Sequence, residues 1–262
     1  MLESFEVRPF CAPLADGTPI THDVYSKGNS GACVVIIQEL PGIGPETLSL
    51  ADVFVEQGFR VVMPHLFGPL GRISLAGNTA RVFCMRREFS LFSSNKTSPI
   101  VDWLKALCQD LRANHGVDAV GVIGMCLTGN FAISLMADDS VLAGVASQPS
   151  MPIMKHDELH MSATDVAKIR TRLDSEGPMM ALRFEGDPLC TGRKFAALNK
   201  AFNDPSSDPS SDPSSGAGER IRLVELPGKG HSVLTLDLIK GGAPAQQALD
   251  DVITYFTTKL KA

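Results

Sequence analysis

Short apolar runs alternate with longer segments of mixed polarity along most of the 262-residue chain. The runs are rich in β-branched residues and nearly uninterrupted, as expected for strands that helices cover on both faces. The pattern predicts strands at 32–38, 59–63, 117–123, 141–147, 179–184 and 221–225. A further segment, 20–26, has the character of an edge strand.

Between these runs, apolar residues recur with a helical spacing. The predicted helices span 46–57, 100–114, 129–137, 163–175, 193–202 and 245–261. The helix at 163–175 also carries end signals, because Ser162 and Asp165 have the spacing of a capping box and Gly177 follows the last turn. This alternation predicts an α/β fold with a mostly parallel, doubly wound central sheet flanked by helices.

One segment departs from the alternation. Residues 204–215 repeat Asp-Pro-Ser-Ser three times and continue into Gly216-Ala-Gly218. Proline blocks helix and ladder hydrogen bonds, and the repeat has no apolar side chain to bury. We expect a low-complexity surface loop at 204–218 within a single domain spanning 1–262; a phosphorylated or partner-binding segment is the alternative.

Composition narrows the class of protein. Hydrophobic residues make up 44% of the chain, enough for a large core, and the net charge of −5 argues against nucleic acid as the main partner. No run of 18 apolar residues is present, so no membrane span is expected, and the N-terminus lacks the features of a signal peptide. We expect a cytoplasmic protein whose six cysteines are reduced.

Candidate chemistry gathers after the predicted strand 117–123. There Gly124-Met-Cys126-Leu-Thr-Gly129 opens into a helix, the form of a nucleophile elbow, in which a sharp turn lifts one side chain above the sheet. The usual motif is Gly-x-Ser-x-Gly; here cysteine replaces serine and the second glycine comes one residue late. A helix N-terminus beneath Cys126 favours thiolate, and the Leu127 N–H would face an oxyanion. A buried cysteine at an ordinary strand–helix turn is the alternative.

Two later residues complete a possible triad. Asp187 follows the strand 179–184, and His231 lies in a glycine-rich loop after the last strand. The order nucleophile, acid, histidine is that of α/β-hydrolases, and open α/β sheets place their sites at the carboxyl ends of strands. We expect Cys126 to attack a carbonyl, His231 to transfer the proton and Asp187 to orient the imidazole. Taken alone, each residue has a simpler interpretation. Asp187 would then be a turn residue, and His231 would be a loop histidine.

The chain resembles the dienelactone hydrolase family, cysteine-dependent members of the α/β-hydrolase fold. The motifs that carry the resemblance are Val34-Val-Ile-Ile-Gln-Glu39, Gly124-Met-Cys-Leu, Glu185-Gly-Asp187 and Gly230-His231-Ser. The resemblance implies this fold over nearly the whole chain and hydrolysis of a carboxylic ester or lactone through an acyl-cysteine.

The resemblance also assigns a role to Glu39. In the family, a glutamate at this place holds the cysteine in a less reactive resting state until substrate displaces it, which is physically sensible because a buried carboxylate suppresses thiolate formation. The N–H of Leu40 would be the second oxyanion donor beside that of Leu127. A strand-end charge paired with a neighbouring cation is the alternative for Glu39.

The sequence departs from the family pattern at the substrate carboxylate site, which two arginines form in the dienelactone enzymes. One of these arginines lies four residues after the histidine in the family, and this position is occupied by Thr235 here. The other falls in the region of Arg81, Arg86 and Arg87, and each of these is equally a solvated surface residue. The departure disfavours dienelactone itself as the substrate, while acyl transfer to water remains the expected reaction.

Other motifs are weaker. Gly42-Ile-Gly44 lies where a dinucleotide fingerprint would, but the third glycine is missing. His156 and His160 have zinc-protease spacing without the catalytic glutamate or a third ligand nearby. Residues 147–150 fit either pocket lining or a turn, and we do not assign them to the site.

We therefore expect an enzyme that needs no metal or organic cofactor. Its partner would be a small-molecule ester or lactone, with no nucleic acid and no membrane, and the protein would be a monomer or weak homo-oligomer. A non-catalytic ligand-binding relative of the same fold is the first alternative. A nucleotide-binding oxidoreductase is the second and weaker one.

Overall fold

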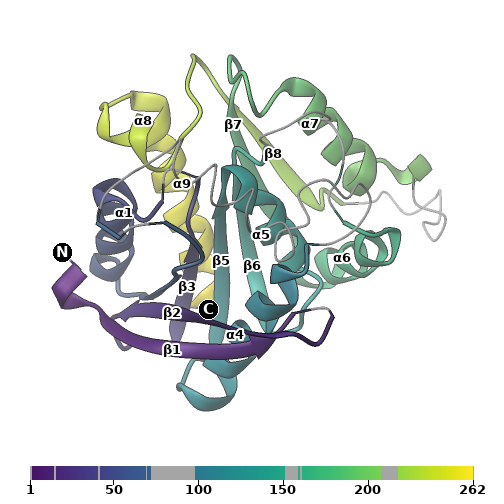
Figure 1. Ribbon diagram of the computed structural model, residues 1–262. Coiled ribbons are helices and arrows are strands. Elements are labelled where there is room, and N and C mark those ends of the chain that lie inside the picture. The colour runs from purple at the N-terminus through teal and green to yellow at the C-terminus, as the bar shows by residue number, and fades with distance from the viewer. Residues whose placement is uncertain are drawn as a thin grey trace.

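The central feature is one mixed sheet. The computed structural model describes residues 2–14, 16–40, 42–68, 70–71, 98–150, 159, 161–207 and 218–261. Within them, eight strands are ordered β1-β2-β4-β3-β5-β6-β7-β8 (Figure 1). Their bounds are Glu6–Pro13 (β1), Pro19–Lys27 (β2), Ala32–Ile37 (β3), Arg60–Pro64 (β4), Ala119–Met125 (β5), Val141–Ser147 (β6), Met179–Phe184 (β7) and Ile221–Leu226 (β8).

From β4 to β8 in this order, adjacent strands are parallel to one another, which confirms the mostly parallel sheet expected from the sequence. Every residue of β3, β5 and β7 is buried. This burial explains why these strands appear in the sequence as uninterrupted apolar runs. Because they are parallel, β3, β5, β6, β7 and β8 all end at the same edge of the sheet.

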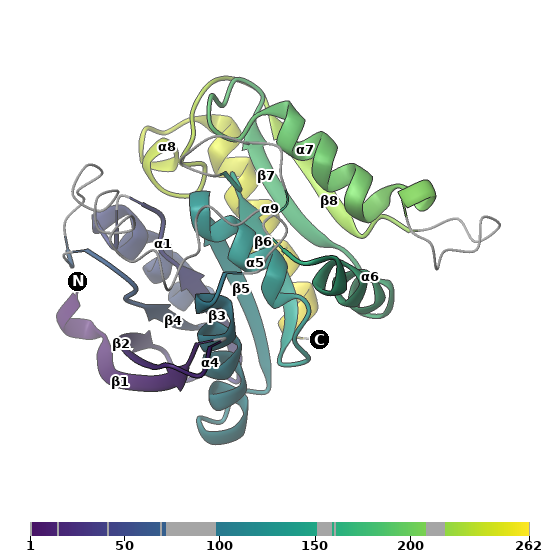
Figure 2. The same cartoon turned by 45° about the vertical axis from the view of Figure 1, so that its right-hand side comes forward.

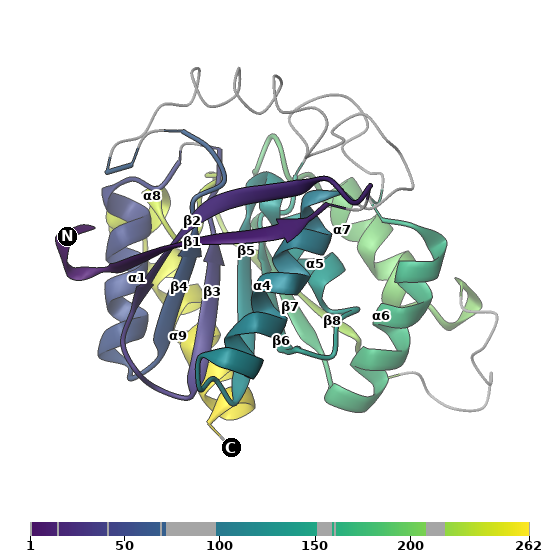
Figure 3. The ribbon, with the colours of Figure 1, turned by 60° about the horizontal axis from the view of Figure 1, so that its bottom comes forward.

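The prediction of an edge strand at 20–26 was wrong in its placement. β2 is an inner strand, paired antiparallel to β4 on one side and to β1 on the other. Figure 3 shows β1 and β2 as a long hairpin. The outer strand β1 contains Pro9 and Pro13, which donate no ladder hydrogen bond and are tolerated at an edge.

Helices cover both faces of the sheet. Their bounds are Pro45–Glu56 (α1), Ile100–Asn114 (α4), Gly129–Leu135 (α5), Ala163–Glu176 (α6), Gly192–Leu198 (α7), Leu236–Ile239 (α8) and Ala243–Leu260 (α9). α1 and α9 share one apolar cluster, in which Phe54 and Phe256 are in contact, and α4, α5 and α6 share the other. Figures 1 and 2 show α5 on the near side of the sheet and α9 on the far side.

Local signals at the helix ends agree with the structure. The Ser162 hydroxyl accepts a hydrogen bond from the Asp165 N–H at 3.1 Å, and Gly177 ends α6 with a φ of 85°. Of the loop expected at 204–218, Pro205–Ser207 forms a 3₁₀ turn, while 208–217 lie outside the described residues. Among the helices of the described segments, none has both the length and the apolarity needed to cross a bilayer.

Candidate active site

The turn after β5 holds Cys126 in an unusual backbone conformation. Cys126 has a φ of 59° and opens a short 3₁₀ helix, Cys126–Thr128, that leads directly into α5. Within the described part of the chain, Gln148 is the other non-glycine residue with positive φ. Such conformations cost about 1–3 kcal/mol and persist where the surroundings enforce them, as they do at functional sites. The strand, sharp turn and helix thus have the geometry of a nucleophile elbow.

Small residues and one threonine build this elbow. A Cβ atom on Gly124 would lie 2.1 Å from the Thr128 carbonyl oxygen, and one on Gly129 would lie 2.9 Å from Pro149 Cα. Thr128 occupies the place of the second glycine in the usual motif. Its hydroxyl accepts a hydrogen bond from the Met125 N–H at 2.9 Å and lies 3.0 Å from the Ile37 carbonyl oxygen at the end of β3. The threonine that replaces this glycine therefore connects the elbow to the neighbouring strand β3.

Asp187 and His231 meet at the same edge of the sheet. The Nδ1 atom of His231 lies 3.0 Å from Oδ1 and 2.9 Å from Oδ2 of the buried Asp187. Oδ1 of Asp187 also accepts hydrogen bonds from the N–H groups of Leu189 and Cys190, at 2.8 and 3.0 Å. These bonds fix the carboxylate so that it orients the imidazole through Nδ1–H.

The two loops that carry the acid and the histidine pack against each other. The Gly186 N–H donates to the Gly228 carbonyl oxygen at 3.0 Å, and a Cβ atom on Gly186 would lie 2.7 Å from Lys229 Cγ. Asp237 fixes the backbone of the second loop, since its Oδ2 accepts from the N–H groups of His231 and Ser232 at 2.9 and 3.0 Å. Sequence reasoning missed Asp237, whose role depends on how the loop folds back.

Cys126 lies near enough to His231 to influence the pKa of the ring. Burial disfavours the charged ring, but the hydrogen bond with Asp187 and the interaction with Cys126 outweigh it and raise the pKa of His231 to about 10. The Nε2 atom is buried and, among the described residues, has no hydrogen-bond partner. The nitrogen that does not face Asp187 is therefore available for proton transfer.

Glu39 lies in the turn after β3 and is only 2% exposed. Its Oε1 accepts a hydrogen bond from the Thr235 hydroxyl, and its Oε2 accepts from the Ser232 hydroxyl at 2.9 Å and from Gln148 Nε2 at 3.5 Å. Burial raises the pKa of the Glu39 carboxyl, although both hydroxyl groups favour the charged form. These hydrogen-bond partners are hydroxyl and amide groups, and the nearby charge of His231 also favours the ionised form of the Glu39 carboxyl.

Ser150 contacts the candidate nucleophile, and sequence reasoning left it unassigned. Its buried Oγ lies 3.3 Å from the Sγ of Cys126. Its backbone N–H donates to the Cys126 carbonyl oxygen at 3.1 Å, and its own carbonyl oxygen accepts from Asn130 Nδ2 at 3.1 Å. The available signal was its place just after β6, the strand paired with β5.

The remaining assignments are not resolved by the structure. Leu40 and Leu127 are both buried beside Glu39 and Cys126, and the oxyanion roles of their N–H groups stay predictions. The candidate arginines and the two histidines with zinc-protease spacing lie outside the described residues: Arg81, Arg86, Arg87, His156 and His160.

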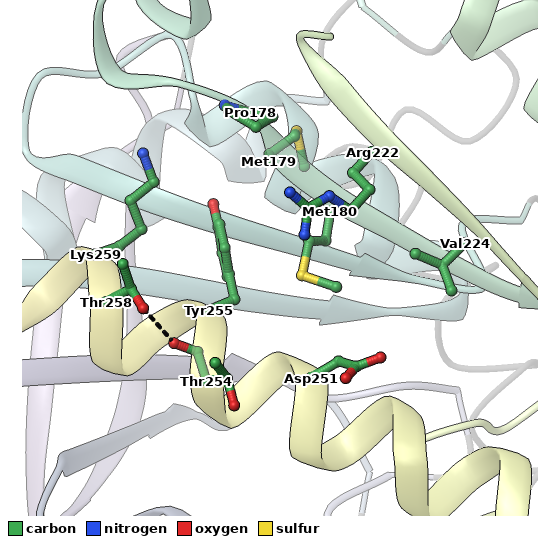
Figure 4. Close-up of a pocket in the computed structure, with 10 residues that line it drawn as sticks. All are labelled: Pro178, Met179, Met180, Arg222, Val224, Asp251, Thr254, Tyr255, Thr258 and Lys259. Atoms are coloured by element: carbon green, nitrogen blue, oxygen red, sulfur yellow. Dashed lines mark hydrogen bonds between the residues drawn. The ribbon is translucent and has the colours of Figure 1, made fainter.

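A groove of about 460 Å³ lies elsewhere, between β7, β8 and α9 (Figure 4). Met180, Arg222, Tyr255 and Lys259 are among its lining residues, and none of the triad candidates is. It lies on the α9 side of the sheet, whereas the elbow helix α5 packs on the other side. The groove is therefore separate from the candidate active site.

Comparison with known proteins decides the family. The sequence model described as the dienelactone hydrolase family matches residues 22–207, a range that includes Glu39, Cys126 and Asp187. The chain belongs to the dienelactone hydrolase family. A carboxymethylenebutenolidase from Rhodococcus opacus is 29% identical over 124 residues, which are 46% of this chain and 44% of that protein. The matched stretch thus spans less than half of that relative's length.

Solved structures show the fold of this dienelactone hydrolase family member. A dienelactone hydrolase-like promiscuous phosphotriesterase from metagenomic libraries aligns with a TM-score of 0.64 at 16% identity, over 98% of this chain and 99% of that chain. A cold-adapted esterase from an Arctic intertidal metagenomic library aligns with a TM-score of 0.61 at 16% identity, over 98% and 95%. At these identities the likeness establishes the α/β-hydrolase fold.

Proposed function

We propose that the protein hydrolyses a carboxylic ester or lactone through an acyl-cysteine intermediate on Cys126. The observation that carries this proposal is the hydrogen-bonded pair of the buried Asp187 and the partly buried His231, together with the strained elbow at Cys126, which is one of the groups that raise the pKa of His231. The similarity to a carboxymethylenebutenolidase and to an esterase supports the same reaction class.

The acylation half of the reaction begins with the thiolate. A protonated His231 beside the sulfur stabilises the thiolate form. The sulfur attacks the carbonyl carbon, and the electron pair of the carbonyl moves to its oxygen, which the N–H groups of Leu40 and Leu127 would bind. When the carbonyl re-forms, the bond to the alkoxide breaks, and the alkoxide takes the proton from Nε2 of His231. The products of this half-reaction are an acyl-cysteine thioester and an alcohol.

Deacylation reverses the roles of these groups. Neutral His231 takes a proton from water through Nε2, and the resulting hydroxide attacks the thioester carbonyl. Collapse of this second intermediate releases the carboxylic acid and the Cys126 thiolate, and the protonated ring is restored. Asp187 holds the ring through Nδ1–H in both halves. With a lactone, the acid and the alcohol are parts of one product molecule.

Glu39 and Thr235 bear on substrate choice and regulation. We propose that Glu39 restrains Cys126 in the resting state, as the family resemblance implies, and that its hydrogen bonds to Ser232 and Thr235 must rearrange for it to do so. Thr235 is neutral, and its hydroxyl is bonded to Glu39 where an arginine would hold a substrate carboxylate. This substitution favours esters and lactones that lack a free carboxylate.

A panel of small aryl esters and lactones, with and without a free carboxylate, tests the proposal. We expect hydrolysis, stoichiometric alkylation of Cys126 by iodoacetamide, and loss of both in Cys126→Ala. Turnover that survives this substitution would show that the nucleophile is misassigned. The non-catalytic alternative, which the neutral Thr235 favours, would instead give thermal stabilisation by a ligand without Cys126-dependent hydrolysis.

A further inference from the structure

The segment Ser147-Gln-Pro-Ser150 lies beside the elbow and has a strained backbone. Gln148 is buried with a φ of 37°, and its N–H donates to the Leu182 carbonyl oxygen on β7 at 2.6 Å. From this turn, the Gln148 side chain reaches Glu39 and Ser150 reaches Cys126. One short loop therefore contacts both the candidate nucleophile and the carboxyl group expected to regulate it.

The Ser150 main chain is fixed independently of its side chain. Its N–H donates a hydrogen bond to Cys126, and its carbonyl oxygen accepts one from Asn130. These two hydrogen bonds hold the residue against the elbow and α5, and neither of them involves the hydroxyl. Ser150 is 1% exposed, so water has little access to its hydroxyl. This leaves the hydroxyl, 3.3 Å from the Cys126 sulfur, as the one part of Ser150 that faces the reacting atom.

We propose that Ser150 is a positioning residue that donates a hydrogen bond to the Cys126 thiolate, an inference that rests on the proposed function of Cys126. A hydrogen bond to an ionised acceptor is about twice as strong as one between neutral groups. The bond stabilises the attacking sulfur and fixes its direction. It weakens when the sulfur becomes part of a thioester, and it forms again as the thiolate leaves during deacylation.

The hydrogen bonds of Glu39 support this assignment. In the described structure, the carboxyl oxygens of Glu39 are bonded to Ser232, Thr235 and Gln148, while the hydroxyl of Ser150 is the group bonded to the sulfur. A hydroxyl donor stabilises a thiolate, whereas a carboxylate would oppose it. In this arrangement the sulfur is hydrogen-bonded to a group that assists its ionisation, and the proposed restraint by Glu39 requires Glu39 to leave its present partners.

The test is the pH dependence of Cys126 alkylation by iodoacetamide, followed by peptide mass spectrometry because the exposed Cys11 can also react. Ser150→Ala removes only the hydroxyl. We expect alkylation about tenfold slower than in the unsubstituted protein near neutral pH, the effect of losing a hydrogen bond to a charged group. The difference should close at high pH, where the thiol is ionised in both proteins. Ser150→Thr, which keeps a hydroxyl, should restore the original profile.

Ser134→Ala is the matched control, because it removes a buried hydroxyl that is bonded to the Asn130 carbonyl oxygen in α5. We expect this variant to keep the original alkylation profile. An unchanged profile in Ser150→Ala, or an equal loss of rate at every pH, would overturn the inference. If Cys126 is labelled and required for turnover while Ser150→Ala matches the unsubstituted protein, this inference alone fails. If Cys126 is not labelled at all, the proposed function fails with it.

Discussion

The hydroxyl of Thr235 donates a hydrogen bond to Oε1 of Glu39, at the position where the family resemblance implies a substrate-binding arginine. Both side chains are buried. Thr235→Val keeps the shape of the residue but leaves a buried carboxyl oxygen without this donor. We expect a loss of about 1–3 kcal/mol in the free energy of unfolding, measured in urea.

A double-mutant cycle checks that this loss comes from the Thr235–Glu39 pair. In a Glu39→Gln background, Thr235→Val should cost less than in the unsubstituted protein, because the bond to a charged acceptor is already absent. Equal costs in the two backgrounds would mean that Thr235 stabilises the protein through packing alone.

The gating role of Glu39 can be tested apart from stability. Glu39→Gln removes the ionisable group, so we predict faster alkylation of Cys126 in the absence of substrate. The measurement is the second-order rate constant with iodoacetamide, with Cys126→Ala as the blank. An unchanged or slower rate would contradict a resting-state restraint by Glu39.

The raised pKa of His231 predicts how stability changes with pH. Its folded-state pKa is about 10, against an ordinary value of 6.5, so the stability it contributes is fully present below about pH 6.5 and is lost as pH rises through about 10. His231→Gln should therefore destabilise the protein most near pH 6, and the deficit should shrink toward pH 10. Urea unfolding across this pH range measures the difference in stability between the two proteins. A deficit that grows with pH would contradict the raised pKa of His231.

The elbow depends on Gly124, where a Cβ atom would lie 2.1 Å from the Thr128 carbonyl oxygen. Gly124→Ala should cost on the order of 3 kcal/mol and reduce Cys126 alkylation, since the turn must shift to make room. Gly218→Ala is the control, because a Cβ atom there meets nothing within 4 Å. Wild-type stability and reactivity in Gly124→Ala would show that the turn has more freedom than this geometry implies.

Much of the fold follows from local pattern. The bounds of β6, β7 and α4 agree with the sequence prediction residue for residue, because uninterrupted apolar runs and regular helical spacing are local properties. β1 was missed because its prolines and its alternating exposure are typical of a loop as well as of an edge strand. The shared edge of parallel strands likewise allowed the grouping of Cys126, Asp187 and His231 to be predicted.

The partners within the site were harder to predict. Thr235, Asp237 and Ser150 act through loops whose course depends on tertiary packing, and a serine in a short polar segment carries no distinctive signal. The extent of the single domain, the cytoplasmic location and the monomeric or weakly oligomeric state stay predictions from the sequence.

The covalent intermediate tests the central claim most directly. The protein is quenched with acid during hydrolysis of an aryl ester, and its peptides are analysed by mass spectrometry. The account predicts an added acyl group on the peptide that contains Cys126, and neither adduct nor turnover in Cys126→Ala. An acyl group on another residue, or turnover that persists without Cys126, would contradict it.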